Sequence, residues 1–267
     1  MNINIRKKTV LALGSALMLF GTALHAQEQP WSFGVKGGFS MAWLRGLKNM
    51  GQDQIGGAQA TNDTSAKKSF TGGLTAGYAF HENVGVGIEV LYAGLGSTLK
   101  TSKKLPSDAS DADKKNNKPN ELNIYSHNIA VPVLVKLFPM GCDPEEGILT
   151  VELGPEFVFP VGVTLKKKES GQEEFKEIKG KSNKDISKDE LFNLMTVGAV
   201  FGVSYEFPEI GLTLEGRYHW GLMNPLKDDT EAKSLIKDTL VLKEDKTVNN
   251  RYAAFSVGYN FARLLMD

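Results

Sequence analysis

Residues 70–95, FTGGLTAGYAFHENVGVGIEVLYAGL, are the stretch that decides the class of fold. From Phe70 to Phe80 nearly every second residue is apolar, and the residues between them are small or mildly polar. The same alternation resumes from Val84 to Tyr92 after the tripeptide His81-Glu82-Asn83. Period-two alternation puts alternate side chains on opposite faces of a strand, and a short connection containing Asn predicts a hairpin.

The two faces of this hairpin differ in a way that favours a membrane barrel. One face is bulky and apolar, whereas the other is small, rich in glycine and nearly uncharged. In a soluble β-sandwich the small face would have to meet solvent, which its lack of charge does not suit. In a membrane barrel the small face lines a crowded lumen and the bulky face meets lipid. A soluble sandwich with an aromatic core remains the alternative.

The first 26 residues are predicted to be a secretory signal peptide that is removed. Arg6-Lys7-Lys8 form a basic segment, the residues from Val10 to Phe20 are almost wholly apolar, and small residues follow. Cleavage is expected after Ala26, with Ala23 as the alternative. Residues 27–267 are expected to form one outer-membrane β-barrel domain.

The composition of the remaining chain excludes several classes of function. Removal of three basic residues from 31 leaves 28 against 31 acidic residues, which does not indicate nucleic-acid binding. No later run approaches the roughly 18 apolar residues of a membrane helix, so any spanning is expected from strands. Cys142 is the only cysteine and His25 leaves with the signal, so no metal site or cofactor is expected.

Alternating patterns predict an all-β fold, an eight-stranded antiparallel up-and-down transmembrane barrel. The connections between strands alternate long and short, which is typical of outer-membrane barrels with long extracellular loops and short periplasmic turns. Pro132 cannot donate to a ladder and marks a bulge or a locally unpaired position. The strands are expected at about residues 31–43, 70–80, 84–95, 122–138, 148–165, 193–207, 212–222 and 251–261.

Aromatic residues on the outward parity form two groups, as expected for belts at the two membrane interfaces. The group near the short turns is Phe33, Tyr78, Phe80, Tyr205, Phe207, Tyr259 and Phe261. The group near the long loops includes Phe39, Trp43, Phe70, Tyr92, Phe157, Phe159, Tyr218 and Trp220.

The inward parity collects charged side chains that we expect to form a structural network in the lumen. Charges buried in a narrow barrel must pair or be hydrated, and eight strands leave an interior just wide enough for side chains to fill. A salt-bridge plug is therefore expected, with a proton or ion path as the other reading. The residues are Lys36, Glu89, Lys136, Glu152, Glu156, Glu206, Glu215, Arg217 and His219.

Catalytic arrangements are not supported by the spacing of these groups. Glu152 and Glu156 on one face of a strand lie roughly 13 Å apart, too far for a pair of glycosidase carboxylates. Ser126, His127 and Asn128 are sequence neighbours whose side chains alternate between faces, so they cannot form a triad among themselves. His127 could still meet a serine on a neighbouring strand, which keeps a lipid-modifying enzyme open, although no catalytic residue is expected.

Three short segments resemble the PorT-type outer-membrane β-barrel family of Bacteroidetes, which has OmpA-like small-barrel architecture. They are Phe33-Gly34-Val35-Lys36-Gly37-Gly38, Ile129-Ala130-Val131-Pro132-Val133-Leu134-Val135-Lys136 and Val257-Gly258-Tyr259-Asn260-Phe261. The resemblance implies a location in the cell outer membrane. It implies activity only weakly, because members range from a secretion accessory to many barrels of unknown role. The last segment also resembles the signal read by the barrel-assembly machinery during insertion.

The expected role is structural or partner-binding, through extracellular loops that hold most of the charge. The loop from Asn224 to Asn249 also contains the apolar residues Leu235-Ile236 and Leu240-Val241-Leu242. Three interpretations of this apolar patch stay open: an extension of the two flanking strands beyond the membrane, a cover over the barrel mouth, or a binding edge for an unidentified protein partner. The expected partners are otherwise outer-membrane lipid and the assembly machinery, and the barrel is expected to be a monomer. A narrow pore for ions or small solutes and a lipid-modifying enzyme remain the alternatives.

Overall fold

The computed structural model describes residues 31–45, 60–103, 120–143, 146–168, 176–177, 193–208, 210–225 and 249–262. The predicted signal peptide, most of the loop 224–249 and the long connections therefore lie outside the described residues. The strands are β1 (Trp31–Arg45), β2 (Ala60–His81), β3 (Val84–Lys103), β4 (Asn120–Leu137), β5 (Ile148–Lys168), β6 (Lys176–Glu177), β7 (Thr196–Glu206), β8 (Leu212–Gly221) and β9 (Asn249–Asn260). No helix among the described residues is long and apolar enough to cross a membrane.

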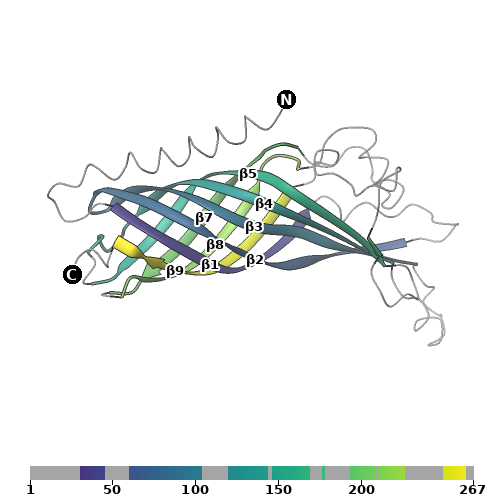
Figure 1. The fold of residues 1–267 in the computed structure, drawn as a ribbon, viewed down its shortest axis with the longest axis horizontal. Helices are drawn as coiled ribbons and strands as arrows, with labels where there is room; N and C mark the ends of the chain where they lie inside the picture. The colour runs from purple at the N-terminus through teal and green to yellow at the C-terminus, as the bar shows by residue number, and fades with distance from the viewer. Residues whose placement is uncertain are drawn as a thin grey trace, which may run out of the picture. The chain divides into compact units, whose positions relative to one another are not determined.

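Eight of these strands form one closed antiparallel barrel, which Figure 1 shows from the side with its strands tilted. Each of the eight strands pairs with the next one along the chain, with β5 pairing with β7 past the short β6, and β9 pairs with β1 to close the ring. The two-residue β6 pairs only with the end of β5 and takes no part in closure. The predicted eight-stranded up-and-down barrel is thus confirmed.

The strands are staggered as they circle the barrel. The pairing, followed once around from Trp31 through the eight strands, returns to β1 at Met41, ten residues further along. With ordinary strand spacings this stagger corresponds to a tilt of about 40° from the barrel axis. The tilt brings together inward residues from strands that are not paired with one another.

Short turns gather at one end of the barrel. Only Glu82 and Asn83 separate β2 from β3, and Asn83 Nδ2 donates to Phe138 O at 3.0 Å, which joins this turn to the β4–β5 connection. Between β7 and β8, Gly211 has a φ of 65°, a left-handed conformation that glycine adopts without strain. The start of β1 and the end of β9 lie at the same end, as an even number of strands requires.

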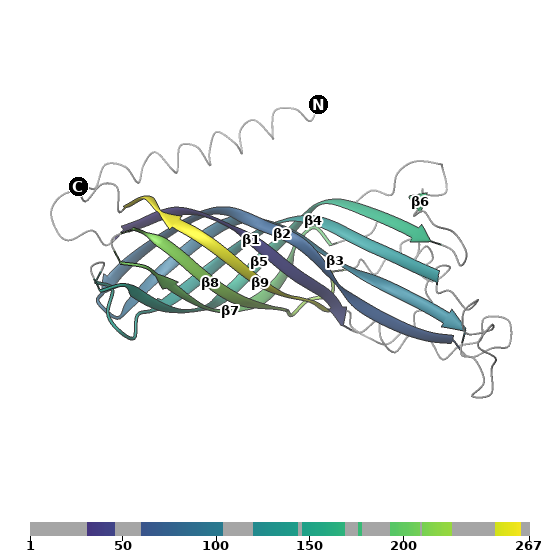
Figure 2. The ribbon, with the colours of Figure 1, turned by 90° about the horizontal axis from the view of Figure 1, so that it is seen from below.

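Strands β2, β3 and β5 are longer than the sequence pattern predicts. β2 begins at Ala60 rather than near Phe70, β3 continues to Lys103, and β5 continues to Lys168. Figure 2 shows β2, β3, β4 and β5 projecting past the ends of β1 and β7–β9, and this projecting part is called the β2–β5 extension. The predicted loops were wrong here because segments such as 60–66 have no apolar alternation, yet their backbones pair along the neighbouring strand.

A bulge corrects the predicted faces at the end of β5. His127 pairs with Gly162 and Asn128 with Pro160, so β5 carries one extra residue at this point. Unbroken alternation along the predicted strand 148–165 would put Val163 on the outward face and Gly162 and Thr164 on the inward face. The extra residue reverses this parity, so Val163 pairs with inward-facing Ser126, and Gly162 and Thr164 face outward. Near Pro132 the β3–β4 pairing is interrupted, which confirms a locally unpaired position there.

The outer wall of the barrel is apolar, and the lumen is filled. Outward side chains such as Phe39, Leu74 and Phe255 are 76%, 58% and 59% exposed, respectively. The lumen instead contains a charged cluster and an adjacent apolar one. The buried members of the apolar cluster are Ala42, Leu91, Ala93, Leu95, Ala130, Val158 and Tyr252.

Candidate functional site

Strand β8 supplies the centre of the charged cluster in the lumen. Its alternate residues Glu215, Arg217 and His219 all point inward and are 7%, 4% and 2% exposed. A glycine on the neighbouring strand makes room for the largest of them, because a Cβ at Gly202 would lie 2.7 Å from Arg217 Cγ. The predicted inward parity of these three residues is confirmed.

The guanidinium group of Arg217 joins three carboxylates from three strands. Its Nη1 and Nη2 donate to the two oxygens of Glu89 at 2.5 and 2.7 Å, a bidentate pair. Its Nε and Nη2 also donate to Glu152 Oε2 at 3.0 and 2.5 Å, and Nε lies 2.9 Å from Glu215 Oε1. Each of the three guanidinium nitrogens therefore contacts at least one carboxylate.

Two lysines complete the charge balance around these carboxylates. Lys36 Nζ lies 2.7 Å from Glu89 Oε2 and donates to both oxygens of Glu215 at 3.0 Å. Lys136 Nζ lies 3.4 Å from Glu152 Oε1. Three acids and three bases thus form a neutral network, hereafter the lumen network: Lys36, Glu89, Lys136, Glu152, Glu215 and Arg217.

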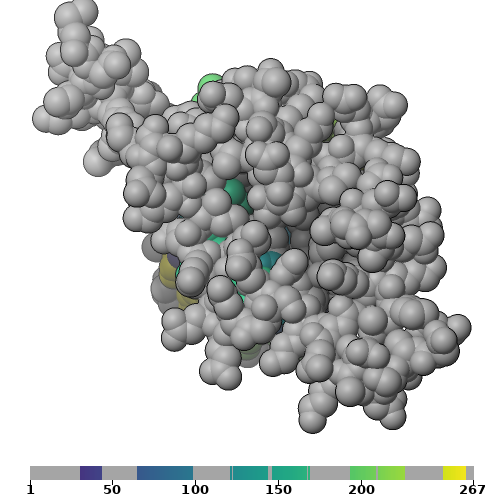
Figure 3. All heavy atoms as spheres, turned by 90° about the vertical axis from the view of Figure 1, so that its right-hand side faces the viewer, coloured from purple at the N-terminus to yellow at the C-terminus, as the bar shows by residue number. Residues whose placement is uncertain are grey.

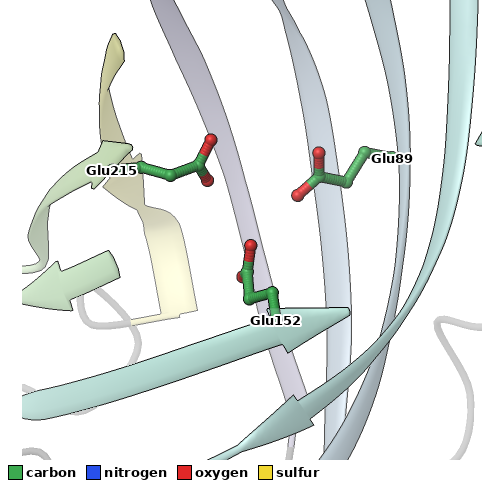
Figure 4. Close-up of side chains that lie close together, drawn as sticks. All are labelled: Glu89, Glu152 and Glu215. Atoms are coloured by element: carbon green, nitrogen blue, oxygen red, sulfur yellow. The ribbon is translucent and has the colours of Figure 1, made fainter. Parts of the chain in front are cut away.

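The three carboxylates point toward one another from β3, β5 and β8 (Figure 4). One oxygen from each of Glu89, Glu152 and Glu215 lies within 4.8 Å of the others, a spacing that suits a divalent cation in principle. Arg217, Lys36 and Lys136 already contact these carboxylates and together neutralise their charge. The geometry is therefore that of an ion-pair network with its cations supplied by the chain.

Glu156 belongs to a second buried group beside the lumen network. Tyr252 OH donates to Glu156 Oε1 at 2.6 Å, and His219 Nδ1 lies 3.0 Å from the same oxygen without the alignment of a hydrogen bond. The His219 ring stacks on the Tyr252 ring with centroids 3.7 Å apart. Tyr252 was not among the predicted residues, although its inward parity on β9 could have indicated it.

Glu206 is the predicted residue that belongs neither to the lumen network nor to the second buried group around Glu156. It lies near the turn end of β7, and its oxygens are 3.3 and 3.4 Å from Asn260 Nδ2 rather than beside Arg217. Parity alone placed it with the others, because parity fixes the face of a strand but not the height along the barrel.

The three neighbours Ser126, His127 and Asn128 separate between two faces, as predicted. Asn128 Nδ2 donates to Ser126 Oγ at 3.0 Å within the lumen. On the outer face, His127 Nδ1 contacts Tyr92 OH at 2.6 Å. A chain through Tyr92 and Tyr125 then reaches Ser69 on β2, which has a Tyr125 contact of 2.9 Å, so two phenols stand between this histidine and that serine.

Comparison with known proteins agrees with this architecture. Residues 25–227 match the outer membrane protein β-barrel domain family. The chain belongs to this family. Members of the outer membrane protein β-barrel domain family are outer-membrane barrels, so the exposed apolar wall of this protein faces lipid.

Several solved structures of small outer-membrane barrels resemble this member of the family at low identity. Neisserial surface protein A is 14% identical with a TM-score of 0.39, the match covering 85% of this chain and 96% of that one. OprG of Pseudomonas aeruginosa is 13% identical with a TM-score of 0.37, covering 88% and 97%. Ail of Yersinia pestis is 11% identical with a TM-score of 0.34, covering 88% and 100%. No curated protein sequence matches the chain.

Proposed function

We propose that this protein is a monomeric outer-membrane anchor with a closed lumen, which binds a partner at the end where β2–β5 project. The observation that carries the proposal is the lumen network, in which Arg217 ties β8 to β3 and β5 across the interior. Binding is proposed at the extracellular side, with the long loops outside the cell.

The lumen network supports a plug rather than a pore. Side chains of Arg217, Glu89 and Glu152 are 1%, 2% and 2% exposed, so water has little access to them. Opening a path would separate several ion pairs and leave charges unpaired at low dielectric, which is costly. Purified barrel in a planar bilayer is expected to give no discrete channel openings. Reproducible openings that disappear with Arg217→Trp would contradict the plug and favour the narrow pore.

The β2–β5 extension supports a partner-binding role. Pairing of β1 with β2 ends at Ala42–Lys67, whereas β2 continues to Ala60, so among the described residues no strand pairs with this length of β2 on the β1 side. An edge strand is a template for strand addition by another chain. Figure 3 views the molecule from this end, where teal atoms in the colour range of β4 and β5 are visible at the centre.

Photocrosslinking in intact cells tests the binding role. A photoreactive residue at Thr64 in the extension, or at Ser234 in the loop 224–249, is expected to give a discrete crosslinked band. The same residue at Thr213, near the turn end of β8, is the control and is expected to give none there. Crosslinking from Thr213 alone would reverse the proposed binding side, and no crosslinking from any position would refute the role.

We also propose that the protein has no catalytic activity and that it belongs to the PorT-type family. Mass spectrometry of lipid A from cells with and without the protein is expected to show no difference; a modified species would favour the enzyme.

Similarity of three segments to the PorT-type family supports membership of that family, and the basic and apolar N-terminus supports a cleaved signal. N-terminal sequencing of the mature protein is expected to begin at Gln27.

A further inference from the structure

A row of three outward side chains crosses β1, β9 and β8 toward the loop end of the barrel. Arg251 on β9 lies directly opposite Trp43 on β1 and Trp220 on β8. Residues opposite one another on one face of antiparallel strands have their Cβ atoms about 5 Å apart. The Arg251 guanidinium lies over the Trp220 ring, 4.8 Å from its centroid, and Trp220 is 49% exposed on the outer wall.

Arg251 differs from the cations of the lumen in lacking an acid. Each base of the lumen network contacts at least one carboxylate, and Arg217 contacts three. Within the described part of the chain, no carboxylate contacts Arg251, and its Nε is buried without a hydrogen-bond partner. A cation without an acid is unfavourable beside lipid unless an anion pairs with it, and because Nε is buried, such an anion would meet the terminal Nη1 and Nη2 groups.

The surroundings of Arg251 indicate which anion this is. Tryptophans on the wall of a membrane barrel lie at the depth of the lipid headgroups, and the anions at that depth are phosphates. The planar fork of arginine binds phosphate through two parallel N–H donors, and stacking on an indole fixes the plane of the fork. Arg251 supplies the fork and Trp220 supplies the indole, side by side on the outer wall.

We infer that Trp43, Arg251 and Trp220 form a binding site for the phosphate group of a phosphorylated glycolipid in the outer leaflet. The choice of leaflet rests on the proposed function, which puts the loop end outside the cell. The lipid phosphate would accept from the Arg251 guanidinium, and the two indoles would pack against the sugar and upper acyl carbons.

Native mass spectrometry of the barrel in a phosphate-free maltoside detergent tests this site. The probes are monophosphoryl lipid A, the same lipid A dephosphorylated, phosphatidylglycerol and inorganic phosphate. Wild-type barrel is expected to retain monophosphoryl lipid A about tenfold better than the dephosphorylated form, as one charge-assisted interaction allows. It is also expected to prefer monophosphoryl lipid A to phosphatidylglycerol and to bind no inorganic phosphate at equal concentration.

Matched variants identify the residue responsible. Arg251→Gln is expected to abolish the preference for the phosphorylated lipid, and Arg251→Lys to reduce it severalfold because a point charge lacks the stacked fork. Lys68→Gln is the control, since exposed Lys68 lies opposite outward-facing Met41 and has the same charge change without flanking tryptophans. The heat-modifiable folded band on gels is expected to be the same for all three variants, so that a loss of binding is not a loss of folding.

Each contrary result overturns a definite part of the inference. Equal retention by wild type and Arg251→Gln, or equal losses from Arg251→Gln and Lys68→Gln, would show that no specific site exists. Wild-type retention by Arg251→Lys would refute the role of the stacked fork. Preference for phosphatidylglycerol or free phosphate would refute the glycolipid, independently of the whole-cell labelling that tests topology.

Discussion

Replacing Arg217 by alanine removes the cation on which the lumen network depends. Three acids then face only two bases, Lys36 and Lys136, at the positions that the structure gives them. Loss of one partner of a buried ion pair typically costs about 3–5 kcal/mol. With a urea dependence of about 2 kcal/mol per molar, Arg217→Ala is expected to lower the unfolding midpoint by about 2 M.

The structure also predicts which second change restores stability. Without Arg217, Glu89 keeps Lys36 at 2.7 Å, whereas Glu152 keeps only the more distant Lys136 at 3.4 Å. Adding Glu152→Gln to Arg217→Ala should therefore recover more of the midpoint than adding Glu89→Gln.

Urea titrations of folded barrel in lipid vesicles, followed by tryptophan fluorescence, measure these midpoints. Glu206→Gln is the control, because this carboxylate lies away from Arg217, and its midpoint should stay close to that of the wild type. An unchanged midpoint for Arg217→Ala, together with altered conductance in a planar bilayer, would refute the plug. Equal rescue by both second changes would refute the assigned geometry.

Three further predictions test the lipid face, the topology and the second buried group. Val86 is 43% exposed on the outward face, and Val86→Arg should cost about 2–4 kcal/mol of folding free energy near the membrane midplane and weaken the heat-modifiable folded band. Tolerance equal to that of an arginine at a loop position would refute the outward face assigned to Val86. A cysteine introduced at Ser110 should react with an impermeant maleimide on whole cells, whereas native Cys142 should not. Because burial raises the pKa of the Cys142 thiol, labelling of Cys142 in lysed cells should increase from pH 7 to pH 9. Labelling of Cys142 alone on whole cells would invert the topology. Tyr252→Phe removes a buried donor to a carboxylate of β5 and should cost about 1–3 kcal/mol in urea titrations, whereas a wild-type midpoint would show that this hydroxyl contributes nothing.

The sequence by itself determined the strands of the barrel, their order and the faces of most residues. Alternation has a period of two residues, so the face of Glu89 or Arg217 follows from its position in the strand. Alternation did not predict strand ends that lack an apolar face, nor the position where a bulge interrupts the regular hydrogen-bond ladder. The extension of β2 to Ala60 has no apolar alternation, and the bulge at Gly162 reverses a parity that the sequence shows as continuous.

Only the tertiary structure decided which side chains meet. The ten-residue stagger tilts the strands, so two of the partners of Arg217, Glu89 and Glu152, come from β3 and β5, to which β8 is not paired. The same register aligns Arg251 between Trp43 and Trp220 on the outer wall. The physical reason is that parity is a local property of each strand, whereas height along the barrel depends on hydrogen-bond register summed around all eight strands.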